Sequence, residues 1–488
     1  MNNEQKKSFL ILTLGCKLNQ LESESINDVL IKAGYSPSSA LNSRPPASGS
    51  QFLPSVIVIN TCTVTSKADQ KARRVIRKAL RDYPQAVVIV TGCYAQLNKD
   101  DILKLETNGR RRLFVIKKDD IINLPQYLYE KNQNNNEISL HISQTEGSIP
   151  PGKSKENSLF TFNPIHFSSH TRSFLKIQDG CDKRCTYCRI RLARGSGVSL
   201  SAREVLSRLR ILEQNHGEAV LTGVNICQYK DFEFFYNKPH EQTRTKENNL
   251  AELLDYLLSN TSKIAIRLSS LAQESVDEKL TEVLSHARIR PHFHLSIQSG
   301  SQKILERMGR SYNAQTIERA VTLLRGAKDD PFLACDIISG FPGETENEFE
   351  ETFSLCRKMD FAWIHVFPYS KRPGTPAFSF KDTVHESDVT KRVELFTALA
   401  KKGREAYVKR WLGRDVDVLI ENREHRIKNN ECKFTYCYGV SDNYLKTLVR
   451  CNDDKEPMPG EVVACRLIEM SDEMDVDVKG VAVADEIR

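Results

Sequence analysis

The feature that most constrains the fold is an alternation of short apolar runs with amphipathic helical stretches. Between residues 171 and 387 six runs of strand length (FLKIQ, AVLTG, IAIRLSS, FHLSIQ, LACDIIS and WIHVFPYS) are separated by stretches whose apolar residues recur at helical spacing. Such alternation predicts parallel strands joined by crossover helices. Six units are typical of a partial (β/α)6 barrel, whose chemistry lies on loops after the strands' C-terminal ends.

The first segment, residues 1–131, repeats this alternation with the runs SFLILTLGC, SVIVINTC, AVVIVTGC and LFVIKK. It therefore predicts a doubly wound parallel α/β sheet. A helix over 67–81 follows the second run, with an apolar face and an opposite face of seven cations, Lys67, Lys71, Arg73, Arg74, Arg77, Lys78 and Arg81. Residues 36–55, rich in Ser and Pro, are expected to be a flexible insertion.

The rest of the chain divides by composition. Residues 132–170, polar and rich in Asn, Pro, Gly and Ser, indicate a linker. Residues 171–412 contain the predicted barrel and a long closing helix at about 388–412. Residues 413–488 hold five short β-rich runs, which indicate a small β-barrel of a kind that often binds nucleic acid.

Composition favours a soluble, cytoplasmic protein. Hydrophobic residues make up 40% and charged residues 27% of the 488 residues, and no apolar run approaches the roughly 20 residues that span a bilayer. The start resembles a signal peptide, but its apolar stretch covers only Phe9–Leu14, and a first strand explains it better. The net charge of +7 is compatible with a nucleic-acid partner without demonstrating one.

The strongest chemical signal is the spacing Cys181-x3-Cys185-x2-Cys188, directly after the first predicted barrel strand. Three thiolates at this spacing hold three irons of a four-iron cluster and leave the fourth iron open to an external chelator. Reductive cleavage of S-adenosylmethionine requires such an open iron. The alternative is a zinc site whose fourth ligand comes from a histidine such as His166, His170 or His216.

A second constellation consists of Cys16, Cys62 and Cys93, each of which follows a predicted parallel strand of the first segment. Because the carboxyl ends of parallel strands share one crevice, these thiolates are expected to meet there and to hold a second cluster. The alternative is three unrelated structural cysteines. Six of the thirteen cysteines are interpreted as buried apolar filler: Cys335, Cys356, Cys432, Cys437, Cys451 and Cys465.

The motifs LGCKLNQLESE, INTCTVTSKADQKARR, VTGCYAQ, QDGCDKRCTYC, HLSIQSGSQKILERMGRSY, DIISGFPGETENEF and HVFPYSKRPGTPA occur in this order. Over nearly the whole chain the sequence resembles the methylthiotransferases of the radical S-adenosylmethionine superfamily, and YGVSDNYLKTLV resembles their C-terminal TRAM barrel. The resemblance implies two [4Fe-4S] clusters. The Cys181/Cys185/Cys188 cluster would give a 5′-deoxyadenosyl radical that abstracts hydrogen from carbon 2 of a tRNA adenine. The Cys16/Cys62/Cys93 cluster would deliver sulfur, methylated by a second S-adenosylmethionine.

The resemblance also implies further contacts. The cofactor would be held by Tyr187, Thr222, Gly223, Ser296, Gln298 and Arg310, in a mouth shaped by Asp336 and residues 340–345. The partners would be the anticodon loop of tRNA and an electron donor such as flavodoxin or ferredoxin; the sulfur source stays open. The run after the third cluster cysteine and the run containing Cys227 depart from the family pattern, which leaves the cofactor and substrate contacts less defined than the cluster ligands.

The substrate branch is indicated by the first motif. Lys17 and Asn19 after the first cysteine resemble the threonylcarbamoyladenosine branch, whereas the branches acting on isopentenyladenosine or on a ribosomal-protein aspartate typically show other residues there. An anionic threonylcarbamoyl group requires a cation in its pocket. Candidates are Arg189, Arg191, Arg194, Lys371 and Arg372. From another class, a non-catalytic iron–sulfur RNA-binding protein is the alternative.

Overall fold

The computed structural model describes residues 7–38, 53–106, 112–129, 160, 172–231, 249–421, 427–429, 434–452, 457–472 and 475–487. These residues form two compact units. The first unit holds the described residues before 130, together with Asp179–Lys183 and Cys188–Val198. The second unit holds residues 172–178, Arg184–Tyr187 and the described residues from 199 onward.

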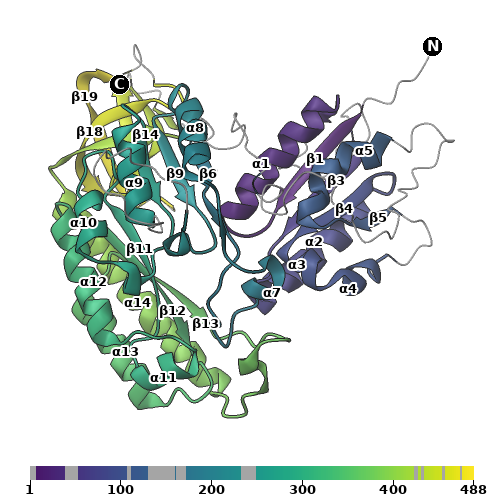
Figure 1. Cartoon of the computed structure of the whole chain (residues 1–488). Helices are drawn as coiled ribbons and strands as arrows, with labels where there is room; N and C mark the ends of the chain where they lie inside the picture. Colours follow the sequence, from purple (N-terminus) through teal and green to yellow (C-terminus); the bar gives the residue numbers. More distant parts are fainter. Residues whose placement is uncertain are drawn as a thin grey trace, which may run out of the picture. The chain divides into compact units, whose positions relative to one another are not determined.

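The first unit is built on a five-stranded, wholly parallel sheet in the order β2-β1-β3-β4-β5 (Figure 1). Its strands are β1 (Ser8–Thr13), β2 (Ser36–Pro37), β3 (Val56–Thr61), β4 (Val87–Gly92) and β5 (Leu113–Val115). The two long central strands, β3 and β4, are buried along their whole length, as expected for a sheet covered on both faces. The order reverses at β1, which places a topological switch point between β1 and β3.

Helices cover both faces of this sheet, which confirms the predicted doubly wound architecture. Apolar residues of α1 (Lys17–Lys32) and α5 (Leu124–Tyr129) pack on one face, and those of α2 (Ser66–Asp82) and α4 (Lys99–Leu103) pack on the other. Helix α2 begins where the side chain of Thr65 accepts a hydrogen bond from the Ala68 N–H. The unit also contains α3 (Cys93–Leu97), the 3-10 helix η1 (Lys118–Asn123) and α7 (Ile190–Arg194).

The second unit contains six parallel strands in chain order: β6 (Ser173–Lys176), β9 (Glu218–Thr222), β10 (Ala265–Leu268), β11 (His292–Gln298), β12 (Phe332–Ser339) and β13 (Trp363–Pro368). They pair as two three-stranded sheets, and isolated parallel bridges such as Leu271 with Leu295 join β10 to β11. This arrangement confirms the predicted partial (β/α)6 barrel. The short strands β7 (Gln178–Asp179) and β8 (Val198–Ser199) flank the segment that contains the three clustered cysteines.

Helices follow the barrel strands, and the sequence predicted all of them except the short helix over residues 302–307. They are α8 (Ala202–Glu213), α9 (Leu250–Ser259), α10 (Glu278–Leu284), α11 (Gln302–Arg307), α12 (Ala314–Ala327), α13 (Glu346–Met359) and the closing helix α14 (Glu386–Trp411). Short 3-10 helices are η2 (Ile226–Gln228), η3 (Gln273–Ser275) and η4 (Pro376–Ser379).

The C-terminal strands close into a five-stranded barrel. Its strands are β14 (Asp415–Ile420), β16 (Phe434–Ser441), β17 (Lys446–Asn452), β18 (Val462–Met470) and β19 (Val478–Ile487), and pairing of β14 with both β18 and β16 completes the ring. A sixth strand, β15 (Ile427–Asn429), extends β16 as a hairpin. The ring agrees with the five predicted runs.

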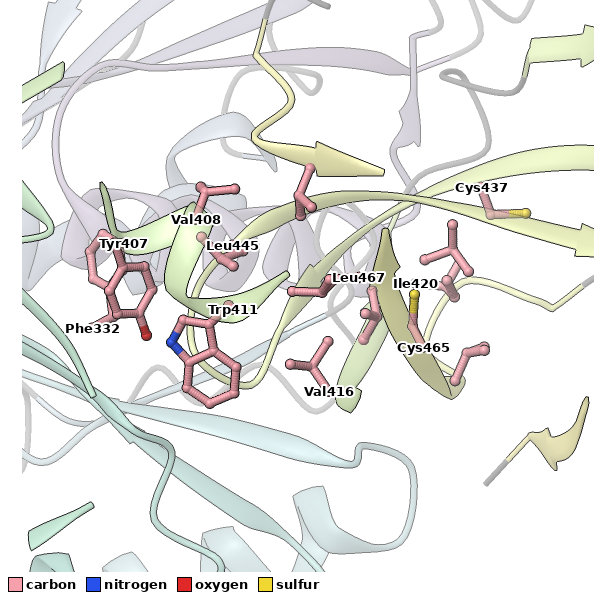
Figure 2. Close-up of a cluster of buried hydrophobic side chains, with 14 of the residues drawn as sticks. Phe332, Tyr407, Val408, Trp411, Val416, Ile420, Cys437, Leu445, Cys465 and Leu467 are labelled. Carbon is pink, nitrogen blue, oxygen red and sulfur yellow. The ribbon is translucent and has the colours of Figure 1, made fainter. Parts of the chain in front are cut away.

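This small barrel shares its apolar core with the larger one. Figure 2 shows Phe332 of β12 and Tyr407 and Trp411 of α14 beside Val416 and Leu467 of the small barrel, and these residues form one buried cluster. Cys437, Cys451 and Cys465 are buried in the same cluster. The two barrels are therefore parts of one packed unit.

Some sequence expectations fall outside the described residues: most of the 36–55 insertion, nearly all of the 132–170 linker, Cys432 and the zinc candidates His166 and His170. Within the insertion, residues 36–37 form the edge strand β2, paired in parallel with β1. Among the described residues no helix is long and apolar enough to cross a membrane.

Candidate functional site

Cys16, Cys62 and Cys93 follow the carboxyl ends of β1, β3 and β4, three adjacent strands of the first sheet. Cys16 caps α1 and is exposed, whereas Cys62 and Cys93 are buried. The backbone approaches closely here: a Cβ on Gly15 would lie 2.7 Å from the Cβ of Cys62. Gly15 and Gly92 both have positive φ, so each adjacent cysteine follows a turn that favours glycine.

Two asparagines fix the loops that carry the first two cysteines. The Asn19 amide donates to the Leu14 carbonyl (3.0 Å), to Asn60 Oδ1 (3.1 Å) and to the Thr61 carbonyl (3.0 Å). In return, Asn60 Nδ2 donates to the Asn19 carbonyl at 2.9 Å. Sequence analysis noted Asn19 only as part of a family motif and missed Asn60. These buried amides join α1 to the ends of β1 and β3.

The three thiols interact electrostatically. Burial raises the pKa of Cys62 to about 11; the Val64 backbone N–H and Arg194 lower it, while Cys16 and Cys93 raise it. Burial also raises the pKa of Cys93, and Arg194 opposes that rise. The structure places the three cysteines at the carboxyl ends of adjacent strands. That they hold one cluster stays a prediction.

The described residues contain no group of three His, Cys, Asp or Glu side chains close enough to bind a single metal ion. In an iron–sulfur cluster each thiolate binds a different iron, so its ligands lie farther apart than the ligands of one ion. Three thiols at adjacent strand ends, two of them sheltered from water, fit such a cluster.

The segment that carries the Cys181/Cys185/Cys188 triad is half-buried at all three cysteines. In the first unit, the Cys181 N–H donates to the Gly195 carbonyl at 3.1 Å. In the second unit, the Thr186 N–H donates to the Met308 carbonyl at 3.0 Å, which fixes the backbone next to Cys185. This segment therefore carries partly accessible thiols on a backbone that is held at both of these points.

Tyr187, which precedes Cys188 in this segment, contacts Arg310. Arg310 Nη2 donates to the Tyr187 hydroxyl at 2.7 Å, and the guanidinium lies between the rings of Tyr187 and Tyr312. Tyr312 in turn donates to the Ile297 carbonyl at the end of β11. Arg310 Nε is buried and has no hydrogen-bond acceptor among the described residues, so it has a donor to offer a ligand.

The other expected cofactor residues lie at strand ends of the same unit. Ser296 and Gln298 end β11 beside a register shift, and Gln298 has a positive φ of 67°. Thr222 ends β9, and a Cβ on Gly223 would lie 2.9 Å from the Gln178 carbonyl. The structure thus places all of these residues at the carboxyl ends of barrel strands, where a ligand of such a barrel binds.

A group of polar side chains lies on neighbouring barrel strands. Of its members, only Asp336 was expected from the sequence. His294 Nε2 lies 3.2 Å from Asp336 Oδ1, and its Nδ1 lies 2.8 Å from the Ser270 hydroxyl. The exposed His365 of β13 lies 5.3 Å from His294, ring to ring. Alternation of accessible polar residues with buried apolar ones along β11 and β12 was the available signal.

The candidate cations differ in their surroundings. Arg194 is buried and bonded to Glu22 and Asp179, so it is not available to a substrate carboxylate, and that expectation was wrong. Arg189 lies 3.9 Å from Asp69, whereas Lys371 is exposed just after β13 and lies over the Phe378 ring. Arg372 is buried. On α2, Arg73 bonds to the Tyr94 hydroxyl, so the exposed basic face consists of the other six cations.

Comparison with known proteins separates the N-terminal sheet from the partial barrel, as the structure does. The profile of the radical SAM superfamily matches residues 175–356, and that of the uncharacterized protein family UPF0004 matches residues 8–110. The first match covers most of the partial barrel up to α13, and the second covers the first sheet except β5.

Similar proteins extend over most of the chain. A protein of Treponema pallidum named threonylcarbamoyladenosine tRNA methylthiotransferase MtaB is 37% identical, covering 86% of this chain and 92% of its own. A Thermotoga maritima protein of the same name is 33% identical over 85% of this chain and 87% of its own. A Bartonella bacilliformis protein named tRNA-2-methylthio-N(6)-dimethylallyladenosine synthase is 28% identical over 85% of this chain and 86% of its own.

Proposed function

The chain belongs to the radical S-adenosylmethionine methylthiotransferase family, and we propose that it converts threonylcarbamoyladenosine at tRNA position 37 to its 2-methylthio derivative. The observation that carries the proposal is the similarity to the Treponema and Thermotoga proteins of that name, which spans most of both chains. The protein named for dimethylallyladenosine is less similar, at 28%. The threonylcarbamoyl branch is therefore favoured over the isopentenyl branch.

Membership of this family implies one [4Fe-4S] cluster and S-adenosylmethionine. We assign the cluster to Cys181, Cys185 and Cys188, which leaves one iron open to the amine and carboxylate of the cofactor. Bound there, the cluster and cofactor supply the 5′-deoxyadenosyl radical. The chain's own part is to hold the cofactor and the adenine in reacting geometry and to exclude water.

We assign the cofactor contacts to the strand ends of the barrel. The Arg310 guanidinium, whose Nε has no acceptor among the described residues, is suited to an anionic or carbonyl oxygen of the cofactor. Tyr187, held by Arg310, offers a ring face. Thr222 and Gly223 lie at the end of β9, where the backbone of Gly223 packs closely against Gln178. Ser296 and Gln298 contribute polar groups from the end of β11.

For Cys16, Cys62 and Cys93 we propose a second four-iron cluster that supplies the sulfur. Their placement at the carboxyl ends of adjacent parallel strands supports this assignment, as does the shelter of Cys62 and Cys93 from water. The Asn19–Asn60 pair would keep the first two ligands in place.

The threonylcarbamoyl carboxylate needs a cation, because an unpaired carboxylate in a closed site is costly. We favour Lys371, which is exposed just beyond the carboxyl end of β13. The exposed His365 of β13 offers a further polar group. Changing Lys371 to Ala should raise the KM for tRNA substrate more than it lowers kcat.

For the tRNA itself we propose contacts from the C-terminal barrel and from the basic face of α2, defined as Lys67, Lys71, Arg74, Arg77, Lys78 and Arg81. All six are exposed. We further propose that the enzyme works in the cytoplasm with a flavodoxin or ferredoxin as electron donor.

The test is mass spectrometry of nucleosides from tRNA of cells with and without the gene. The methylthio derivative of threonylcarbamoyladenosine should disappear without the gene, and re-expression should restore it. If that nucleoside persists while the methylthio-isopentenyl nucleoside disappears, the branch assignment is wrong.

A further inference from the structure

A buried guanidinium contacts Cys93 of the Cys16/Cys62/Cys93 triad. Arg194, the last residue of α7, has a side chain only 2% exposed. Its Nε donates to Cys93 Sγ at 3.1 Å, and its Nη1 donates to Glu22 at 2.9 Å and to Asp179 at 3.1 Å. All four residues belong to the first unit.

The charges of this group are nearly balanced. Lys118 also bonds to Asp179, at 2.9 Å, so two cations and two carboxylates form one network with Arg194 at its centre. Burying a guanidinium is costly unless its donors are satisfied. Glu22 and Asp179 accept the hydrogen bonds of the Arg194 guanidinium and hold it in one orientation, in which Nε points toward the Cys93 sulfur.

The ion pair between Arg194 and Asp179 also joins the two ends of the segment that carries the Cys181/Cys185/Cys188 triad. Asp179 lies two residues before Cys181, and Arg194 lies six residues after Cys188. The two ends of this segment pack closely together. Gly180 has a positive φ of 71°, and a Cβ there would lie 1.9 Å from the Ser196 carbonyl oxygen. Through its bonds to Asp179 and Cys93, Arg194 therefore connects these two ends of the segment to the sheet that carries Cys93.

We propose that Arg194 is a positioning residue that orients Cys93 as a ligand of the second cluster and tunes that cluster by its N–H···S hydrogen bond. The inference rests on the proposed role of Cys16, Cys62 and Cys93. Hydrogen bonds to cluster sulfurs raise the reduction potential, because they stabilise the electron-rich reduced state. Groups that orient metal ligands typically contribute 10–100-fold to metal affinity.

The test uses the full chain with Cys181, Cys185 and Cys188 changed to Ala, which leaves only the Cys16/Cys62/Cys93 site. Arg194→Met removes the charge and the hydrogen bond, and Arg194→Lys keeps the charge without the fork. Arg191→Met is the matched control: it lies on the same helix but is exposed at its guanidinium, which bonds to a backbone carbonyl. The measurements are iron content, the rate of iron release to a chelator, and the midpoint potential of the cluster.

With Arg194→Met, iron release should be about 10–100-fold faster and the potential more negative than in the parent. Arg194→Lys, which keeps the charge, should show a smaller drop in potential and a smaller loss of affinity than Arg194→Met, and it carries the test if the Met variant does not fold. Arg191→Met should match the parent. Equal release rates and potentials in the Arg194 and Arg191 variants would overturn the inference while leaving the second cluster intact. A parent that binds no iron would overturn the cluster assignment and the inference together.

Discussion

Replacing Glu218 with Gln should destabilise the second unit by about 3 kcal/mol. Glu218 begins β9 and is buried; its carboxylate accepts from Arg267 at 2.7 and 3.0 Å and from Arg290 at 2.9 Å. Burial raises the pKa of Glu218, but the two arginines, chiefly Arg267, outweigh it and lower the pKa to about 2. The difference from the ordinary value of 4.5 corresponds to about 3 kcal/mol. Removing one partner of a buried ion pair costs about 3–5 kcal/mol, in agreement.

Arg267 also connects the two barrels, since its Nη2 donates to the Ser441 carbonyl at 3.3 Å and its guanidinium lies over the Tyr444 ring. An unpaired Arg267 should therefore loosen the small barrel together with the strand ends. Thermal unfolding should show a Tm lower by several degrees. The control is Glu278→Gln, whose carboxylate lies 2.7 Å from Arg319 on the surface and is 72% exposed. Its loss should leave the Tm almost unchanged.

The pH dependence provides a second readout. Because folding lowers the pKa of Glu218, its stabilisation is fully present above pH 4.5 and is lost as the pH falls toward 2. The gap in stability between wild type and Glu218→Gln should be constant near neutral pH and should narrow below about pH 4.5. A variant as stable as Glu278→Gln at pH 7, or a gap that widens in acid, would refute the reasoning.

Three further predictions concern function. Anaerobically reconstituted protein should hold about eight irons, and changing Cys181, Cys185 and Cys188 to Ala should halve the iron and abolish 5′-deoxyadenosine; reductive cleavage by that variant would contradict the assignment. Changing Cys16, Cys62 and Cys93 to Ala should spare cofactor cleavage but stop methylthio product, and retained product would exclude sulfur delivery from this site. Reversing the charge of Lys71, Arg74 and Lys78 on α2 should weaken tRNA binding and lower the slope of its salt dependence by about one for each phosphate that the variant no longer neutralises; unchanged affinity would reject the basic face of α2 as a tRNA-binding surface.

Deleting residues 414–488 is a poorer test of tRNA binding. The small barrel buries Phe332 and Trp411 in a shared core, so the deletion would expose apolar surface on the radical domain and impair cofactor cleavage as well (Figure 2). Surface charge reversal on the intact chain avoids this.

Local patterning was sufficient to predict the long strands and most of the long helices. The spacing of apolar residues predicted the strands and helices of both parallel sheets, because a strand buried on both faces must be apolar along its length. The cysteines after β1, β3 and β4 could be placed together because parallel strands end at one edge. A five-stranded barrel followed from five short runs, although β15 did not emerge, since a three-residue hairpin strand leaves almost no pattern.

What the tertiary structure decided is the partner of each polar side chain. The sequence placed Arg194 among three arginines after the cluster and Arg73 among seven cations of one helix, with nothing to separate them. The fold buries Arg194 against Cys93, Glu22 and Asp179, and it turns Arg73 to Tyr94. The sequence determines which residues are apolar at which period, and hence the elements. The partner of each charge depends on contacts between residues far apart in the chain, such as Glu22 and Arg194, which are 172 positions apart. No local period encodes such a contact.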